Sequence, residues 1–304
     1  MISEAVLQAL EDIVPQENIH LNEPLAKHTT FRVGGPADCL VEIENVEQLK
    51  KIQKYLALIE IPYVVIGNGS NLLAGDGGFR GVVLQMGEKN ADIRIEGTTI
   101  TAQAGALLSR IARAAMEHGL TGLEFASGIP GSVGGAVVMN AGAYGGEMKQ
   151  VVTLVKVLNQ EGEELELLND TMEFGYRTSA IKNHPFVVTE VVMELAEGDP
   201  QAIRGQMEDL AARRREKQPL EFPSAGSTFK RPEGYFAGEL IMKAGMRGFQ
   251  VGGARVSDKH CGFVINAGNA SAADVRDVIS EVQQAVEEKF GVVLEPEVIM
   301  LGEF

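Results

Sequence analysis

The chain has 304 residues, 45% of them hydrophobic, which is enough apolar material for two or three cores. Its formal net charge of −15 argues against nucleic acids and anionic membranes as partners, because phosphate-bearing surfaces are bound by an excess of Lys and Arg. No apolar run reaches about 18 residues, and the N-terminus is acidic where a signal peptide is basic, so we expect a cytoplasmic protein.

The two cysteines, Cys39 and Cys261, are far apart and form no CxxC pair. This spacing argues against a disulfide framework and against a thiolate metal site. We therefore expect both to be buried as small hydrophobic side chains, and we expect no metal in the protein.

The first half of the chain alternates predicted helices and strands. Apolar residues at helical spacing predict one helix capped by Ser3 and another capped by Asn45, with Gln48 completing a capping-box pattern. A third helix, residues 107–118, should end at Gly119. The predicted strands cover residues 39–43, 63–66, 82–85, 93–96 and 100–103, the last two forming a hairpin.

Two glycine-rich segments stand out in this half. The apolar strand 63–66 leads into residues 67–71 (GNGSN), and residues 127–146 (SGIPGSVGGAVVMNAGAYGG) form a longer run. Such segments leave backbone N–H groups open to phosphate, although neither has the GxGxxG of a dinucleotide fold or the Gly-Lys-Ser/Thr of a P-loop. A glycine-rich surface loop is the alternative for each, but together they indicate one long, phosphate-bearing ligand.

The second half contains further strands, a composition shift and long helices. Asp199 and Pro200 begin a helix that runs to about residue 217, and we place a domain boundary between residues 1–198 and 199–304. A later helix should begin at Ser271, with Asp274 three residues on as in a capping box, and end near Gly291. The strands predicted at 151–158 and 164–168 should pair around a turn at 160–162. Further strands are predicted at 186–195 and 292–300, the last with Glu295 and Glu297 on one face.

Several polar residues of this half are candidates for chemistry. Arg177, in YRTS, lies on a predicted loop, and Ser227 lies in a small loop beside Lys230 and Arg231. Residues 204–259 contain eleven Lys and Arg and seven Asp and Glu, an excess of four positive charges that could bind an anionic small molecule. Each candidate has an alternative interpretation. Arg177 could be a surface arginine, and Ser227 could belong to an ordinary Ser/Thr turn. Glu295 and Glu297 could be solvated carboxylates, and the arginines at 213–215 could only complement a helix C-terminus.

Six motifs follow one another along nearly the whole chain: TTFRVGG, IGNGSNLL, SGIPGSVGGAVVMNAGAYG, YRTS, SAGSTFKRP and LEPEV. Together they resemble the UDP-N-acetylenolpyruvoylglucosamine reductase family. Several motifs are long and their order is specific, so the resemblance carries more weight than any single glycine loop. The substrate is implied by this resemblance and not by periodicity or composition.

The resemblance implies an α+β protein. Residues 1–198 would form an FAD-binding domain of the vanillyl-alcohol oxidase or para-cresol methylhydroxylase type, made of two α+β subdomains. Residues 199–304 would form a smaller α+β substrate-binding domain, with the C-terminus able to pack back on the first. Because the first glycine-rich segment offers no histidine for covalent attachment, we expect noncovalent FAD. The residues implied to contact it are Gly67, Asn68, Gly69, Ser70, Asn71, Pro130, Gly131, Ser132, Gly134, Gly135, Ala143, Tyr144 and Val188.

The implied reaction reduces the enol ether of UDP-N-acetylglucosamine enolpyruvate to a lactyl ether, with NADPH as the hydride donor to FAD. By the same resemblance, Arg177 and Glu297 would stabilise the enolate-like species, and Ser227 would protonate the neighbouring carbon. Lys217, Lys230 and Arg231 are the candidates for the substrate diphosphate.

One subgroup of the family inserts a loop with a substrate-covering tyrosine after the YR motif. Only a few residues separate Arg177 from the strand predicted at 186, so this chain resembles the shorter subgroup. Separately, we expect the protein to be a monomer. Two other interpretations stay open: another flavin oxidase of the same domain type, and a nucleotide-binding module without catalysis.

Overall fold

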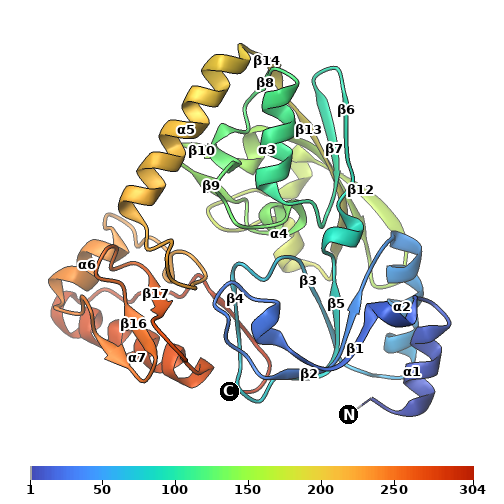
Figure 1. The fold of residues 1–304 in the computed structure, drawn as a ribbon, viewed down its shortest axis with the longest axis horizontal. Helices are drawn as coiled ribbons and strands as arrows, with labels where there is room; N and C mark the ends of the chain where they lie inside the picture. Colours follow the sequence, from blue (N-terminus) through green and yellow to red (C-terminus); the bar gives the residue numbers. More distant parts are fainter. Residues whose placement is uncertain (1) are drawn as a thin grey trace. The chain divides into compact units, whose positions relative to one another are not determined.

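The computed structural model describes residues 2–304, which divide into two compact units (Figure 1). The first unit comprises the residues up to His20, Cys39–Asn68 and Gly81–Arg214. The second comprises Leu21–Asp38, Gly69–Arg80 and Arg215–Phe304. The chain therefore passes between the units several times, and the segments 21–38 and 69–80 belong with the C-terminal residues.

The first two helices have the predicted N-caps. Helix α1 is Glu4–Glu11 and the Ser3 side chain accepts a hydrogen bond from the Val6 amide, while α2 is Val46–Leu58 and Asn45 accepts from the Gln48 amide. The Gln48 side chain accepts from the Glu44 amide, 2.9 Å away, instead of closing a capping box on Asn45. The cap is confirmed and the box is wrong by one residue.

The first glycine-rich segment follows a strand of a four-stranded sheet. Its strand order is β1-β2-β5-β3, with β1 Ile19–Pro24, β2 Pro36–Glu42, β5 Phe79–Gln85 and β3 Tyr63–Ile66. Strand β3 runs parallel to β5, with Ile66 opposite Gln85. The chain leaves β3 at Gly67, at the carboxyl end of the strand, where loops of parallel sheets commonly hold ligands.

A five-stranded antiparallel sheet completes the first unit. Its order is β12-β11-β13-β7-β6, with β12 Glu164–Leu168, β11 Val152–Leu158, β13 Val187–Glu194, β7 Thr99–Gln103 and β6 Ile93–Glu96. Both predicted hairpins are confirmed. Helix α4, Val133–Val138, packs on β13 and β7, and helix α3, Leu108–Glu117, precedes Gly119 in the left-handed conformation. The remaining short strands of this unit are β8 Leu120–Thr121, β14 Ala196–Glu197, β9 Gly142–Ala143 and β10 Gly146–Glu147.

Helix α5, Pro200–Lys217, begins where the sequence predicted, and the Asp199 carboxylate accepts a hydrogen bond from the Gln201 amide. The helix buries Ile203, and most of its other residues are exposed or half-buried. The compact units divide within this helix, between Arg214 and Arg215. The domain boundary predicted between residues 198 and 199 thus lies before the helix, and the division into compact units falls within it.

The second unit is built around helix α7, Ala272–Phe290. Ser271 and Asp274 form the predicted capping box, and Gly291 ends the helix in the left-handed conformation. The helix packs on a three-stranded sheet of β15 Gln250–Val251, β16 Ala254–Val256 and β17 Val264–Asn266, and on α6, Ala237–Lys243 (Figure 1). Its buried valines and Ile279 form one side of the unit's core.

The strand predicted over residues 292–300 is wrong for most of its length. Only β18, Ile299–Leu301, is a strand, and it pairs in parallel with β4, Leu72–Ala74. Pro296 forms an isolated bridge with Phe229. A proline has no N–H to donate to a ladder, so regular pairing stops at this position. Glu295 is exposed and Glu297 is half-buried, so the two carboxylates do not share one solvated face.

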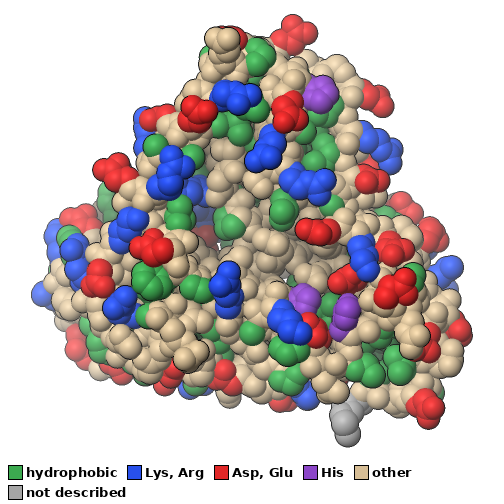
Figure 2. Space-filling model, in the orientation of Figure 1, with side chains coloured by type: hydrophobic (Ala, Val, Ile, Leu, Met, Phe, Trp, Pro, Cys, Tyr) green, Lys and Arg blue, Asp and Glu red, His purple; other side chains and the backbone are tan. Residues whose placement is uncertain are grey.

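Both cysteines are free and buried, as predicted, Cys39 in the core of the first unit and Cys261 in that of the second. Within residues 2–304, no helix has both the length and the apolar character needed to span a membrane. Over the same residues, no group of three or more His, Cys, Asp or Glu is arranged to hold a metal ion. On the face drawn in Figure 2, acidic and basic side chains are interspersed.

Candidate active site

The second glycine-rich segment is anchored at the end of strand β7. The Gly134 amide donates to the Ala104 carbonyl at 2.9 Å, and the Val133 amide donates to the Ala106 carbonyl at 2.8 Å. A Cβ atom on Gly134 would lie 2.9 Å from that of Ala104. The amide of Gly134 is already used inside the protein, so this residue offers a ligand no hydrogen bond, and its lack of a side chain allows the close packing on Ala104.

The two glycine-rich segments meet within the first unit. A Cβ atom on Gly67 would lie 2.2 Å from the Oγ atom of Ser132, so any side chain there would displace the serine hydroxyl. The Asn68 side-chain amide donates to the Pro130 carbonyl at 2.6 Å. Two loops predicted to bind the same ligand from separate parts of the sequence are therefore in contact.

A cavity of about 120 Å³ opens beside this contact. Five residues predicted to contact the cofactor line it: Gly67, Ser132, Gly134, Gly135 and Val188. Much of the remaining wall is apolar and includes Met86 and Phe186. Apolar walls next to glycine backbone suit a flat ring joined to a polar, phosphate-bearing chain.

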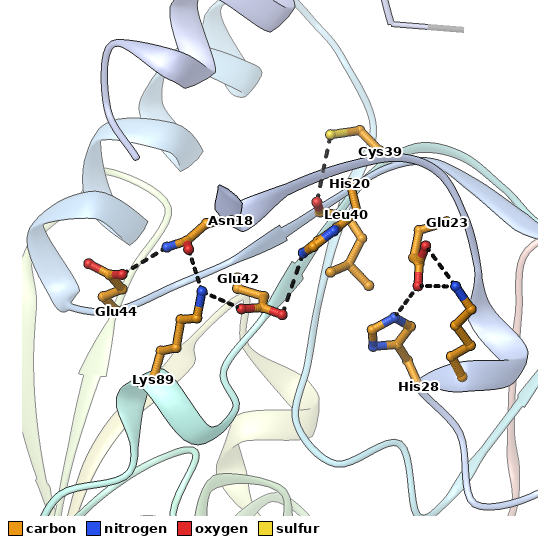
Figure 3. A network of polar contacts seen from close by, with 10 residues as sticks. Asn18, His20, Glu23, His28, Cys39, Leu40, Glu42, Glu44 and Lys89 are labelled. Carbon is orange, nitrogen blue, oxygen red and sulfur yellow. Dashed lines mark hydrogen bonds and ion pairs between the residues drawn. The ribbon is translucent and has the colours of Figure 1, made fainter. Parts of the chain in front are cut away.

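A larger cavity of about 420 Å³ also reaches Gly67, and its wall contains charged residues. In this wall Lys89 lies 2.7 Å from a Glu42 carboxylate oxygen and also donates to Asn18, which donates to Glu44 (Figure 3). The Glu42 carboxylate therefore offsets the charge of this lysine, and the same wall also contains Glu88 and Arg110. The network holds the segment after β5 against the N-terminal residues of the same unit.

The rest of the first glycine-rich segment, residues 69–71, belongs to the second unit. Gly69 has φ +59°, and a Cβ atom there would lie 1.9 Å from the His28 carbonyl oxygen. Ser70 is half-buried. The Asn71 side-chain amide donates to the Glu297 carbonyl at 3.0 Å, which ties this segment to a predicted catalytic residue.

Two of the predicted catalytic residues are brought together within the second unit. The Glu297 amide donates to the Thr228 carbonyl at 2.8 Å, and the Lys230 amide donates to the Glu295 carbonyl at 2.8 Å. Ser227, the residue before Thr228, is exposed. The loop that carries the predicted proton donor is therefore paired along its backbone with the segment that carries the carboxylate.

The third predicted catalytic residue, Arg177, lies in the first unit and has φ +56°. Its Nη2 atom donates to the Gly142 carbonyl at 3.4 Å. Tyr144, expected near the cofactor, has φ +55°, and Ala143 lies in the short strand β9. Left-handed backbone at a non-glycine residue costs about 1–3 kcal/mol, and such residues cluster at functional sites.

The three lysine and arginine candidates for an anionic substrate all lie in the second unit. Lys230 is 2.9 Å from a Glu295 carboxylate oxygen, and this hydrogen bond lowers the pKa of that carboxyl. The Arg231 guanidinium lies 4.0 Å from the centre of the Phe236 ring. Lys217 is exposed at the end of α5.

One arginine at this site was not distinguished by the sequence. A Cβ atom on Gly128 would lie 3.0 Å from Nη1 of Arg214, whose guanidinium carbon is 5.9 Å from the centre of the Tyr144 ring. The neighbouring Arg213 instead pairs with Asp209. The run of three arginines gave no signal for which of them contacts the glycine-rich segment.

Comparisons with known proteins agree with this arrangement. Residues 37–168 match the family described as FAD binding domain, and residues 218–301 match the C-terminal domain of UDP-N-acetylenolpyruvoylglucosamine reductase. A UDP-N-acetylenolpyruvoylglucosamine reductase of Clostridioides difficile is 53% identical over 294 residues, which is 97% of each chain.

Solved structures show the same relationship. The crystal structure of UDP-N-acetylenolpyruvylglucosamine reductase from Thermus caldophilus has a TM-score of 0.79 and 37% identity, and the match covers 93% of this chain and 98% of that one. Phl p 4, a grass pollen allergen with glucose dehydrogenase activity, matches 64% of this chain and 44% of its own at a TM-score of 0.52 and 14% identity, which shows a likeness of fold only. These matches confirm the predicted fold class, an FAD-binding domain of the vanillyl-alcohol oxidase type joined to a second α+β domain. The chain is therefore an FAD-dependent oxidoreductase that belongs to the UDP-N-acetylenolpyruvoylglucosamine reductase family.

Proposed function

We propose that this chain reduces UDP-N-acetylglucosamine enolpyruvate to UDP-N-acetylmuramate with NADPH, a step that supplies peptidoglycan precursors for the cell wall. The observation that carries the proposal is the backbone pairing of the Ser227 loop with the segment of Glu297, which places a hydroxyl and a carboxylate of the family's motifs on adjoining segments. We propose that the enzyme works as a monomer in the cytoplasm.

The glycine-rich segments fit FAD. Contact between Gly67 and Ser132 allows one ligand to touch both loops, and the apolar cavity beside Val188 suits its ring. When bound, FAD supplies the isoalloxazine ring that passes a hydride from NADPH to the methylene carbon of the substrate. We assign binding to the thirteen residues named from the sequence, with Gly134 lining the cavity without donating a hydrogen bond. Residues 1–198 would be the cofactor domain and 199–304 the substrate domain.

The chain's own residues would then manage charge and one proton. Negative charge develops toward the carboxylate of the enolpyruvyl group, and Arg177 would stabilise it by charge. Glu297 would help to stabilise the same enolate-like species, and the Ser227 hydroxyl would give its proton to the neighbouring carbon. Ser227 is exposed, so its hydroxyl is open to a ligand.

Lys217, Lys230 and Arg231 would bind the substrate diphosphate. Lys230 would exchange its exposed partner Glu295 for the more highly charged phosphates, an exchange that costs little because exposed ion pairs are weak. Only residues 178–186, including a short helical turn at Ala180–Asn183, separate Arg177 from β13. There is no room in this connection for a long lid, which supports placement in the shorter subgroup.

The test separates the two half-reactions in Ser227→Ala. Because NADPH oxidation puts no proton on the substrate carbon, the absorbance change on mixing with NADPH should keep its rate. Reoxidation on adding the enolpyruvyl substrate should slow by about 10²–10⁴-fold, the usual contribution of a positioned general acid. Ser224→Ala, in the same loop, is the control and should leave both rates unchanged.

Equal slowing of both half-reactions would show that Ser227 positions ligands and donates no proton. No slowing would assign the proton to another group. If NADPH is consumed with oxygen and peroxide is formed whether or not the enolpyruvyl substrate is present, the protein is instead a flavin oxidase of the same domain type. A chain that binds FAD without any redox cycle would be a nucleotide-binding module.

A further inference from the structure

His260 is a partly buried histidine to which the mechanism above gives no role. It lies in the loop between β16 and β17 of the second unit, and its Nδ1 atom accepts a hydrogen bond from the Gly262 amide at 3.1 Å. An imidazole that accepts at Nδ1 carries its proton on Nε2. The contact to Gly262 therefore exists only for the neutral ring.

The Gly262 carbonyl connects this contact to the backbone beside the predicted catalytic residues. It accepts a hydrogen bond from the Thr228 amide at 2.8 Å, and the Thr228 carbonyl accepts from the Glu297 amide at 2.8 Å. The Thr228 hydroxyl accepts from the Val264 amide at 2.9 Å. Thr228 is fully buried and directly follows Ser227, so the loop of His260 holds the backbone of both Ser227 and Glu297.

The backbone and the ring of His260 each have further contacts. The Ser257 hydroxyl accepts from the amides of Lys259 and His260, at 3.2 and 3.3 Å, and the Phe263 ring packs edge-on with centroids 5.0 Å apart. A Cβ atom on Gly238 would lie 3.3 Å from the imidazole. These contacts hold the backbone at His260, so losing the hydrogen bond at Nδ1 would free Gly262 relative to a fixed neighbour.

The charged groups of the segments around the ring have partners of their own. In the same loop, Asp258 lies 3.8 Å from Arg255, and Lys259 donates to the Arg215 carbonyl. At the start of α6, Glu239 pairs with Lys243, and beyond Thr228, Lys230 pairs with Glu295. Burial lowers the pKa of His260 and outweighs the hydrogen bond to the residue's own backbone, which raises it, so the neutral ring is favoured.

We propose that neutral His260 is a positioning residue that holds Gly262, and through it Thr228, so that Ser227 and Glu297 are aligned for protonation of the substrate carbon. This role rests on the proposed function. Protonation of the ring removes the acceptor at Nδ1, releases Gly262 and misaligns the proton donor. The alignment is present above the lowered pKa of His260 and is lost as the pH falls through it.

The first test follows the rate of substrate reduction from pH 8 to pH 4. In the wild type the rate should fall by about tenfold for each pH unit below the limb, and NADPH oxidation should not share this limb. In His260→Asn, whose side-chain oxygen can accept from Gly262 without titrating, the limb should disappear while the rate at pH 7 is retained. His184→Asn, in the first unit, is the control and should keep the wild-type profile. An acid limb that persists in His260→Asn would overturn the proposal.

The second test needs no substrate, so it stands even if the proposed function fails. In the FAD-loaded protein labelled with ¹⁵N-glycine, the Gly262 amide resonance should shift as the pH falls below the pKa of an ordinary histidine. The shift should be absent in His260→Asn. A Gly262 resonance that does not respond to pH in the wild type would remove the hydrogen bond on which the proposal depends.

His260→Leu, if folded, should reduce the substrate slowly at every pH, and wild-type rates in it would also refute the role.

Discussion

Thr228→Val isolates one buried hydrogen bond at the junction of Ser227 and Glu297. The side chain is fully buried, and valine has nearly the same shape, so little cavity forms. The change removes the acceptor of the Val264 amide, 2.9 Å away, and leaves a buried N–H without a partner. Such a group costs about 1–3 kcal/mol. Across domains of 60–250 residues, a loss of 1 kcal/mol lowers the melting temperature by about 2–8 °C, so the melting temperature should fall by about 2–24 °C.

Thr228→Ser is the matched control, because it keeps the hydroxyl and loses one methyl group, which costs about 1 kcal/mol. Calorimetry gives the melting temperature, and hydrogen exchange at the Val264 amide reports the local bond. Exchange should accelerate in Thr228→Val and remain slow in Thr228→Ser. If Thr228→Val melts with the wild type, or if Thr228→Ser is the less stable of the two, the hydroxyl does not stabilise this junction and the reasoning is refuted.

Two further predictions concern the ligands. Acid or heat precipitation should leave all FAD in the supernatant, because the first glycine-rich segment offers Asn68, Ser70 and Asn71 where a covalent attachment needs a histidine; flavin that stays with the washed precipitate would contradict this. Lys217→Ala and Lys230→Ala should each raise the dissociation constant of the substrate in titration calorimetry. Added salt should weaken the binding of substrate more than the binding of FAD, since exposed charges are screened within about 8–10 Å near physiological ionic strength. Lys243→Ala, a lysine already paired with Glu239 on α6, is the control, and equal affinities in all three variants would remove the diphosphate assignment.

Local signals in the sequence were sufficient for most helices and hairpins. Ser3, Asn45 and the pair Ser271 and Asp274 were recognisable as caps because a capping side chain acts on amides within three residues. Gly119 and Gly291 marked helix ends because glycine adopts the left-handed backbone at no steric cost. The family, and with it the cofactor and reaction, followed from ordered motifs and not from these elements.

Other features depend on contacts between residues far apart in the chain. The alternation of residues 292–300 predicted a strand, but Pro296 interrupts the ladder, and the segment pairs with Phe229 and Asn71 instead. Asn71 and Glu297 are 226 positions apart, and no local pattern encodes their hydrogen bond. The role inferred for His260 likewise depends on Gly262 meeting Thr228, two residues whose types predict nothing together. The sequence by itself determined the elements, because caps, turns and periodicity act over a few residues. Only the tertiary structure decided which loops touch, because backbone hydrogen bonds and burial join segments without regard to their separation or side-chain type.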